Sequence, residues 1–200
     1  LTKKILGLNP HIVIQPNNLT IDDKFISKLK NEFPDIKISK SFSGEGIIIN
    51  NDNAKGVIFK GINKDEKRSI EFLNKNITSG NVKTFNENQV FIGTELAYNL
   101  NLKKNDKISL MSSSFVATPL GSLPKQESFN IAGTFTTGFL EFDQNIVILG
   151  IDDALSIFDK EKKDQNIEIY LKNPLKANIV KSKIEKINPN YFIYTWSDLN

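Results

Sequence analysis

The side chains that could carry catalysis are few in this 200-residue chain, which contains one histidine and no cysteine. His11 would have to act as a general base, and a base also needs an orienting partner. It follows Asn9-Pro10 at the head of an apolar stretch, where we expect a structural or solvent-facing histidine. Ser112 to Ser114 lack the G-x-S-x-G context of a nucleophile elbow. The absence of cysteine excludes disulfides, thiolate metal sites and cysteine nucleophiles.

Neither the acidic pairs nor the glycines form a pattern typical of a metal or nucleotide site. Asp22-Asp23 and Asp152-Asp153 fall where helix caps are expected, and no EF-hand-like spacing is present. Gly44-Glu45-Gly46 lacks the third glycine of a dinucleotide fingerprint and the lysine of a phosphate loop, so we interpret it as a turn. Lys160 to Lys163 predicts a solvated loop. We therefore expect no catalytic residue, no cofactor and no metal, and a chain that is not an enzyme.

Composition narrows the classes of protein to which the chain can belong. The chain has 26 Lys+Arg against 23 Asp+Glu, a net charge of +3, which is too small to indicate a nucleic-acid footprint. With 39% hydrophobic residues and 24% charged residues it is an ordinary globular sequence. Its apolar runs fall far short of the roughly 20 residues that cross a bilayer. Because it begins at Leu1, without an initiator methionine or a signal peptide, we expect it to be part of a longer protein.

Hydrophobic periodicity predicts alternating strands and helices that would position any functional residues. Alternating or β-branched runs predict strands at 11–15, 36–42, 47–49, 57–59, 90–92, 108–110, 128–135, 146–149, 167–171 and 191–195. Helical spacing predicts helices over 20–33, 70–77, 94–100, 152–158 and 173–187. Thr20 is the expected cap of the first helix, and Ser79-Gly80-Asn81 is the expected domain boundary. The predicted fold class is α+β, with one lobe formed by 1–80 plus 145–200 and a β-rich lobe, 81–144, inserted in it.

One segment, residues 115–126, has an unusual composition for the connection between two strands. It is longer than the two to five residues that join antiparallel neighbours. Phe115, Val116, Leu120 and Leu123 are apolar where a surface loop should be polar, and two prolines stiffen the backbone. A stiff arm with exposed leucines is typical of a preorganised binding element. The alternative is that the leucines fold back on the lobe and cover an edge strand.

Several motifs, taken in order, closely resemble one family. They are Leu6 to Ile12, Ile92 to Ala97, Leu102 to Ile108, Thr118 to Pro124 and Phe135 to Asp143. Together they resemble the extracytoplasmic domain of the LolC/LolE permeases, the membrane subunits of the lipoprotein-releasing ABC transporter in the MacB-like superfamily. The resemblance covers nearly the whole chain.

The resemblance implies a periplasmic domain between the first two transmembrane helices of a bacterial inner-membrane permease. Such domains have a Porter-type α+β part with an inserted Sabre-type β-rich lobe. The arm would be the hook that enters the cavity of the LolA-type periplasmic chaperone. Its residues would be Phe115, Val116, Thr118, Pro119, Leu120, Gly121, Ser122, Leu123 and Pro124. A surface pad would hold the outside of the chaperone, with Lys125 and Gln126 as candidate residues, although Glu127 stands where a basic residue is expected.

The expected function is therefore to recruit the chaperone and to assist transfer of acylated lipoproteins. The intact complex would contain a cytoplasmic ATPase subunit and a second permease subunit, and no nucleic acid. The alternatives are a LolE-like domain that contacts the lipoprotein, a MacB-type domain that binds a periplasmic adaptor, or an extracytoplasmic hydrolase. The missing catalytic motifs count against the hydrolase.

Overall fold

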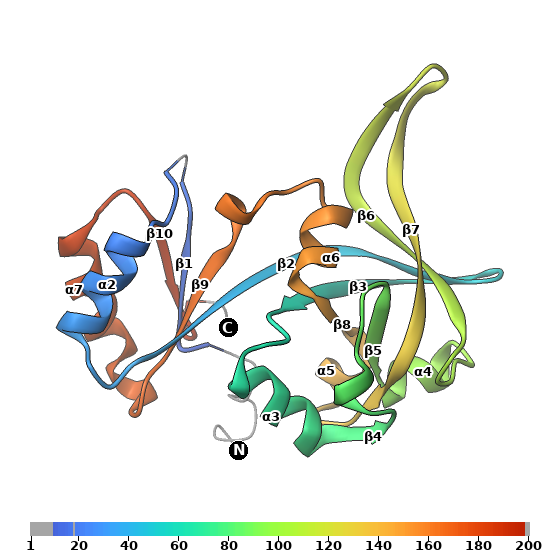
Figure 1. The fold of residues 1–200 in the computed structure, drawn as a ribbon, viewed down its shortest axis with the longest axis horizontal. Helices are drawn as coiled ribbons and strands as arrows, with labels where there is room; N and C mark the ends of the chain where they lie inside the picture. The colour runs from blue at the N-terminus through green and yellow to red at the C-terminus, as the bar shows by residue number, and fades with distance from the viewer. Residues whose placement is uncertain (1–9, 18, 199–200) are drawn as a thin grey trace. The chain divides into compact units, whose positions relative to one another are not determined.

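The computed structural model describes residues 10–17 and 19–198, so the motif residues Leu6 to Asn9 lie outside it (Figure 1). The chain divides into two compact units. Unit 1 comprises Leu1–Ser41 and Glu161–Asn200, and unit 2 comprises Phe42–Lys160. Each unit has its own hydrophobic core. No helix within the described ranges has both the length and the apolar character needed to span a bilayer.

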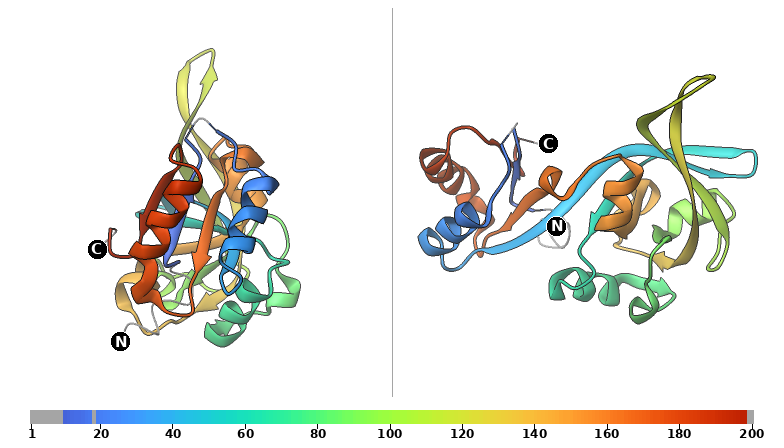
Figure 2. Two further views of the ribbon diagram at one scale, coloured as in Figure 1. Left: turned by 90° about the vertical axis from the view of Figure 1, so that its left-hand side faces the viewer. Right: turned by 45° about the horizontal axis from the view of Figure 1, so that its top comes forward.

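Unit 1 is an antiparallel sheet covered on one face by two helices. The strand order is β10 (Phe192–Thr195), β1 (Ile12–Gln15), β9 (Asn166–Tyr170) and the first part of β2 (Lys37–Asn50). Helices α2 (Asp23–Glu32) and α7 (Ala177–Ile187) lie beside one another against this sheet (Figure 2, left). Their apolar stripes meet the inward-facing residues of the strands in one core, which includes Ile12, Ile14, Phe25, Leu29, Ile169 and Ile184. The short helix η3 (Pro174–Lys176) leads into α7, and η2 (Lys162–Asp164) precedes β9.

Helix caps in the two units follow the predictions only in part. The N-cap of α2 is Asp22, whose side chain accepts the Phe25 N–H at 2.8 Å, and not the expected Thr20. Asn173 caps η3 as predicted, with Pro174 at the first helical position. The N-cap of α6 (Ile151–Ile157) is Gly150, so Asp152 lies in the first turn and does not cap the helix. Its carboxylate still lies near the positive end of the helix dipole, which explains an acidic pair there.

Unit 2 is a larger mixed sheet. Its order is the second part of β2, then β3 (Asn53–Ile62), β8 (Ile146–Gly150), β5 (Gln89–Gly93), β7 (Gly121–Phe135) and β4 (Ile77–Ser79); β6 (Lys107–Thr118) pairs with both β2 and β7. β3 runs parallel to β8, and β5 runs parallel to β7. The helices are α3 (Lys67–Asn76), α4 (Thr94–Asn99), α5 (Leu140–Asn145) and α6, with the short helix η1 (Val82–Thr84). α4 and α6 contribute Leu96, Ala97, Ala154 and Ile157 to the core.

The unit boundaries differ from the predicted lobes. Residues 42–80 and 145–160 belong to unit 2, together with the middle of the chain. The reason is strand pairing: β8 lies between β3 and β5, so both flanking segments complete the sheet of the middle segment. Ser79-Gly80-Asn81 is also not a domain boundary, because Ser79 pairs with Thr134 of β7.

Candidate functional site

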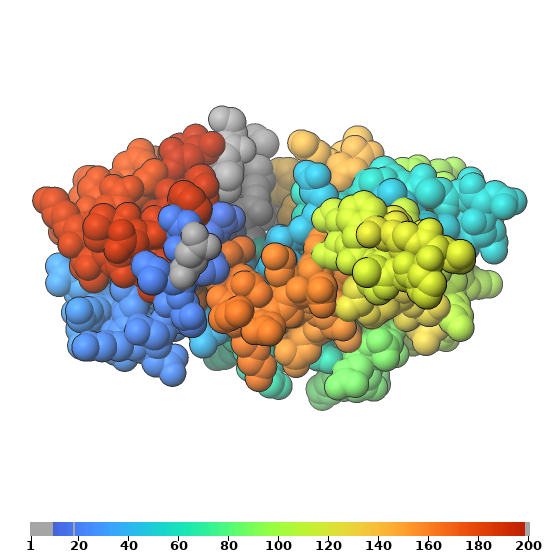
Figure 3. All heavy atoms as spheres, turned by 90° about the horizontal axis from the view of Figure 1, so that it is seen from above, coloured from blue at the N-terminus to red at the C-terminus, as the bar shows by residue number. Residues whose placement is uncertain are grey.

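The predicted arm is a two-stranded ribbon formed by the ends of β6 and β7 (Figures 1 and 2). Phe115 pairs with Pro124, Val116 with Leu123, and Thr118 with Gly121. The expected long connection is therefore wrong as a description of the backbone: both strands continue to a turn at Pro119-Leu120. Strand pairing holds the ribbon although no layer covers it, and its tip stands away from the rest of unit 2 in Figure 1. Figure 3 looks down on the ribbon, whose yellow-green and yellow atoms face the viewer.

The turn at the tip is closed by the threonine and glycine that flank it. Thr118 Oγ1 accepts the Leu120 N–H at 3.2 Å and donates to the Gly121 carbonyl at 2.7 Å. Gly121 has a φ of +116°, a conformation that residues with a Cβ rarely adopt. A Cβ at this position would meet no atom within 4 Å, so the backbone angle and not crowding requires glycine. Pro119 fixes its own φ in the same turn.

The apolar side chains of the ribbon are exposed. Leu120 is 94% exposed at the tip, Phe115 is 64% exposed and Leu123 is 52% exposed. Val116 and Leu123 are directly opposite one another and share one face, while Phe115 and Pro124 share the other. The alternative in which the leucines fold back on the lobe is therefore wrong. The ribbon presents apolar surface on both faces and at its tip.

The base of the ribbon is attached to the last turn of α6. Ser112 donates from Oγ to the Ile157 carbonyl at 2.6 Å, and Ser114 donates to the Phe158 carbonyl at 2.6 Å. Lys125 Nζ, from the other strand, donates to the Ser156 carbonyl. The final carbonyls of a helix have no partner within the helix. The two serines bond the Ile157 and Phe158 carbonyls, and Lys125 adds a second donor to the Ser156 carbonyl, which also accepts the Asp159 N–H at 3.0 Å. Ser112 and Ser114 thus cap the end of the helix, and the register shift between Met111 and Phe115 lies at this point of the strand.

The two candidate pad residues point to different faces of β7, because neighbours in a strand alternate. Lys125 is engaged at the ribbon base, where it also forms an ion pair with Glu127 at 3.7 Å. Gln126 is exposed and pairs with Met111 of β6. The structure does not bring them together in one patch, and only Gln126 presents its side chain to solvent.

The other side chains that could take part in catalysis or metal binding have structural roles. His11 is buried, and its Nδ1 accepts the Leu171 N–H at 2.7 Å, which agrees with the predicted structural role. Asp153 accepts the Asn88 N–H at 3.0 Å; burial raises the pKa of its carboxyl, and this hydrogen bond opposes the shift. Among the described residues no three histidine or acidic side chains form a metal-binding group.

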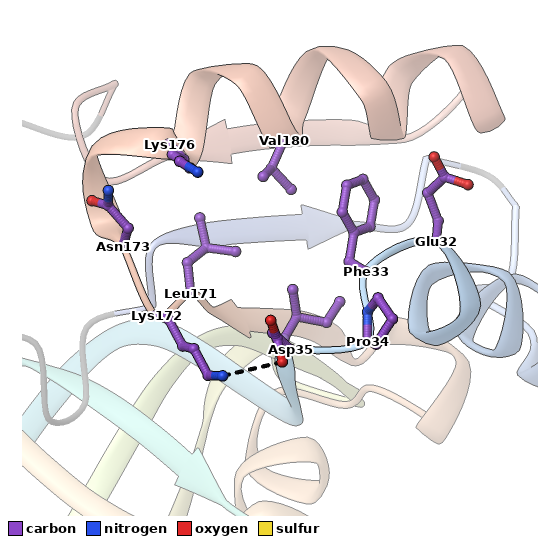
Figure 4. A pocket seen from close by; sticks show the side chains of 10 residues that line it. Glu32, Phe33, Pro34, Asp35, Leu171, Lys172, Asn173, Lys176 and Val180 are labelled. Carbon is purple, nitrogen blue, oxygen red and sulfur yellow. Dashed lines mark hydrogen bonds and ion pairs between the residues drawn. The ribbon is translucent and has the colours of Figure 1, made fainter.

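A shallow groove in unit 1 was missed by the sequence patterns (Figure 4). It has a volume of about 290 Å³ and lies between the end of α2 and the start of α7. Phe33, Leu171 and Val180 point into it, and Lys172 forms an ion pair with Asp35 at 3.1 Å at its edge. The groove exists because β2 pairs with β9, which places 32–36 beside 171–180. No local signal in either segment could have revealed it.

Comparison with known proteins gives distant relatives of one kind. No family model matches the chain. LolC of Neisseria meningitidis serogroup B, a lipoprotein-releasing system transmembrane protein, is 23% identical over 137 residues, covering 68% of this chain and 33% of that protein. LolC of Xylella fastidiosa is 24% identical over 102 residues, covering 50% of this chain and 25% of that protein. An uncharacterized membrane protein of Buchnera aphidicola is 25% identical over 203 residues, covering 97% of this chain and 48% of that protein. The chain therefore spans a quarter to a half of the length of these relatives.

Solved structures share the fold at low sequence identity. The periplasmic region of MacB from Actinobacillus actinomycetemcomitans matches with a TM-score of 0.56 at 9% identity, over 96% of this chain and 91% of that one. The extracellular domain of the ABC-type transporter YknZ from Gram-positive bacteria matches with a TM-score of 0.55 at 9% identity, over 94% of this chain and all of that one. The expected α+β fold of the MacB-like type is confirmed. The chain thus has the fold of the MacB and YknZ extracytoplasmic domains and is a distant homologue of LolC over half to two-thirds of its length.

Proposed function

We propose that the ribbon tip enters the apolar cavity of a LolA-type periplasmic chaperone and recruits it to the permease. The observation that carries this proposal is the 94% exposure of Leu120 at the end of a paired, proline-stiffened ribbon. Exposed apolar residues gathered on a protruding element are typical of a binding site. The distant LolC homologues support a partner from the lipoprotein-releasing system.

Preorganisation explains how so small an element can bind. The cross-strand pairs and the Thr118 turn hold the ribbon in one conformation, so docking orders little additional backbone. Burial of a leucine side chain stabilises a complex by about 1.5–3 kcal/mol. Leu120 and Leu123 would supply most of this energy, and Phe115 and Val116 would extend the contact toward the ribbon base.

The whole transporter would use this contact to transfer the lipoprotein to the chaperone. A cytoplasmic ATPase subunit would hydrolyse ATP, and a second permease subunit would complete the membrane path. The chaperone held at the ribbon would receive the acylated lipoprotein. The described residues of this domain would contribute recruitment and no chemistry.

Titration of the chain with a LolA-type chaperone tests the proposal. Leu120→Asp places a charge where the cavity is apolar, and we expect it to weaken binding at least tenfold. Leu175→Asp is the matched control, because Leu175 is also highly exposed but lies in unit 1. We expect the control to bind like the unchanged chain. Equal affinity of the Leu120→Asp variant and the unchanged chain would falsify the hook assignment.

A MacB-type adaptor or a mature lipoprotein is the alternative partner, favoured by the fold shared with MacB. Each purified candidate can be tested for binding in the same titration. Binding of an adaptor or a lipoprotein through Leu120, with no binding of the chaperone, would favour this alternative.

A further inference from the structure

The outer side of η3 and α7 exposes two large apolar residues. Leu175 is 81% exposed and Ile179 is 60% exposed. They lie one helical turn apart, on the side opposite Ala177 and Ile184, which are buried against the sheet of unit 1. The described residues of unit 1 therefore leave this apolar pair uncovered while the other side of the same helix is packed.

Lysines flank this pair along the helix. Lys183 lies one turn beyond Ile179, Lys186 lies close to the same line, and Lys176 is on the flank that borders the groove (Figure 4). All three are exposed, and no described carboxylate lies within ion-pair distance of their ammonium groups. We call Leu175, Lys176, Ile179, Lys183 and Lys186 the lysine-flanked face.

Acidic residues of the same stretch do not balance this charge. From residue 172 to residue 186 there are five lysines and one acidic residue, Glu185. Helical periodicity places Glu185 on the flank away from Lys176 and Lys183. Lys172 and Lys181 have their own partners, Asp35 and Asp198, each at 3.1 Å. The excess positive charge is thus concentrated on the side that carries the apolar pair.

The positive charge of the lysine-flanked face indicates which kind of partner can dock there. A second copy of the chain docked through the same face would bring lysines against lysines, which repel. An anionic bilayer fits both features, because lysines contact lipid phosphates while short apolar side chains enter the boundary between headgroups and acyl chains. We propose that the lysine-flanked face docks on an anionic membrane surface. This rests on the assignment to a permease domain and does not depend on the ribbon.

Flotation with lipid vesicles tests this inference. The 200-residue chain is mixed with vesicles of phosphatidylcholine and phosphatidylglycerol in equal amounts, and with vesicles of phosphatidylcholine alone, at low ionic strength. We expect binding to the mixed vesicles only, and we expect added salt to reduce it. Each lysine near an anionic surface contributes about fivefold in affinity, so Lys176→Gln with Lys183→Gln should lower binding by more than tenfold. Leu175→Ser with Ile179→Ser should also lower it.

Matched variants separate this inference from the proposed function. Leu140→Ser removes an exposed leucine from unit 2 and should leave vesicle binding unchanged. Leu120→Asp should also bind vesicles normally, even though it loses the chaperone. Failure of the unchanged chain to float with the mixed vesicles would overturn the inference, and so would binding that survives both double variants. Sedimentation that shows a dimer dissociated by Leu175→Ser would assign the face to a second copy instead.

Discussion

At the scale of single residues, the two glycines in the second half of the long strand β2 serve close packing. Gly44 and Gly46 lie inside the strand and not in the turn that the Gly-Glu-Gly spacing predicted. A Cβ on Gly44 would come within 2.5 Å of the Phe158 ring. A Cβ on Gly46 would come within 2.6 Å of the Met111 carbonyl oxygen and 2.7 Å of the Phe59 ring. In most sequences a short segment rich in glycine indicates a turn. Here the glycines lie inside a strand, where they leave room for the rings of Phe158 and Phe59 that pack across it.

Gly46→Ala tests this packing. Because the nearest atom is backbone, the neighbour cannot move at low cost, and we expect the free energy of unfolding to fall by about 1–3 kcal/mol. Gly56→Ala is the matched control, since it lies in β3 with no atom within 4 Å of the added Cβ. Urea unfolding followed by circular dichroism measures both. Equal stability of the two variants would contradict the packing argument.

At the scale of elements, the strands at the two ends of the ribbon could be predicted, but the ribbon itself could not. Ile108 and Leu110 alternate with polar residues, as do Phe129 and Ile131, and these four are buried as expected. Beyond the core the alternation disappears, because a ribbon without a covering layer has no buried face to impose a pattern. Pairing, which sequence periodicity does not report, is what extends β6 and β7 to the tip.

Attachment to α6 should hold the ribbon in one direction relative to the rest of unit 2. Replacing Ser112 and Ser114 by alanine leaves the Ile157 and Phe158 carbonyls without these donors. We expect a broader distribution of distances between spin labels at Ser122→Cys and Lys103→Cys, which attach cleanly because the chain has no other cysteine. Ser113→Ala is the matched control, because Ser113 is exposed between the two capping serines. An unchanged distribution in the double variant would show that strand pairing alone sets the direction.

At the scale of the whole molecule, strand pairing sets the boundaries of the two units. The two chain ends form one unit and Phe42–Lys160 form the other, whereas the sequence predicted an insertion over 81–144. Periodicity identifies β3 and β8 as strands without revealing that they pair with each other across more than eighty residues. The predicted boundaries follow the change in strand content along the sequence. The boundaries of the two units instead follow the ends of the strand pairing.

This organisation predicts that residues 42–160 fold alone and keep the proposed binding activity. The core of unit 2, from Ile48 to Phe158, lies wholly inside that segment, and so does the ribbon. The cut at Ser41 divides β2 but preserves the pairing of Gly46 to Ile49 with Ser109 to Ser112. We expect cooperative thermal unfolding and a chaperone affinity within about threefold of the full chain, since the pairing of the ribbon and its attachment to α6 lie inside the fragment. The fragment with Leu120→Asp controls for binding by other surfaces. A fragment without a cooperative transition would show that unit 2 needs unit 1 to fold; a folded fragment that does not bind would mean that the binding surface extends beyond residues 42–160.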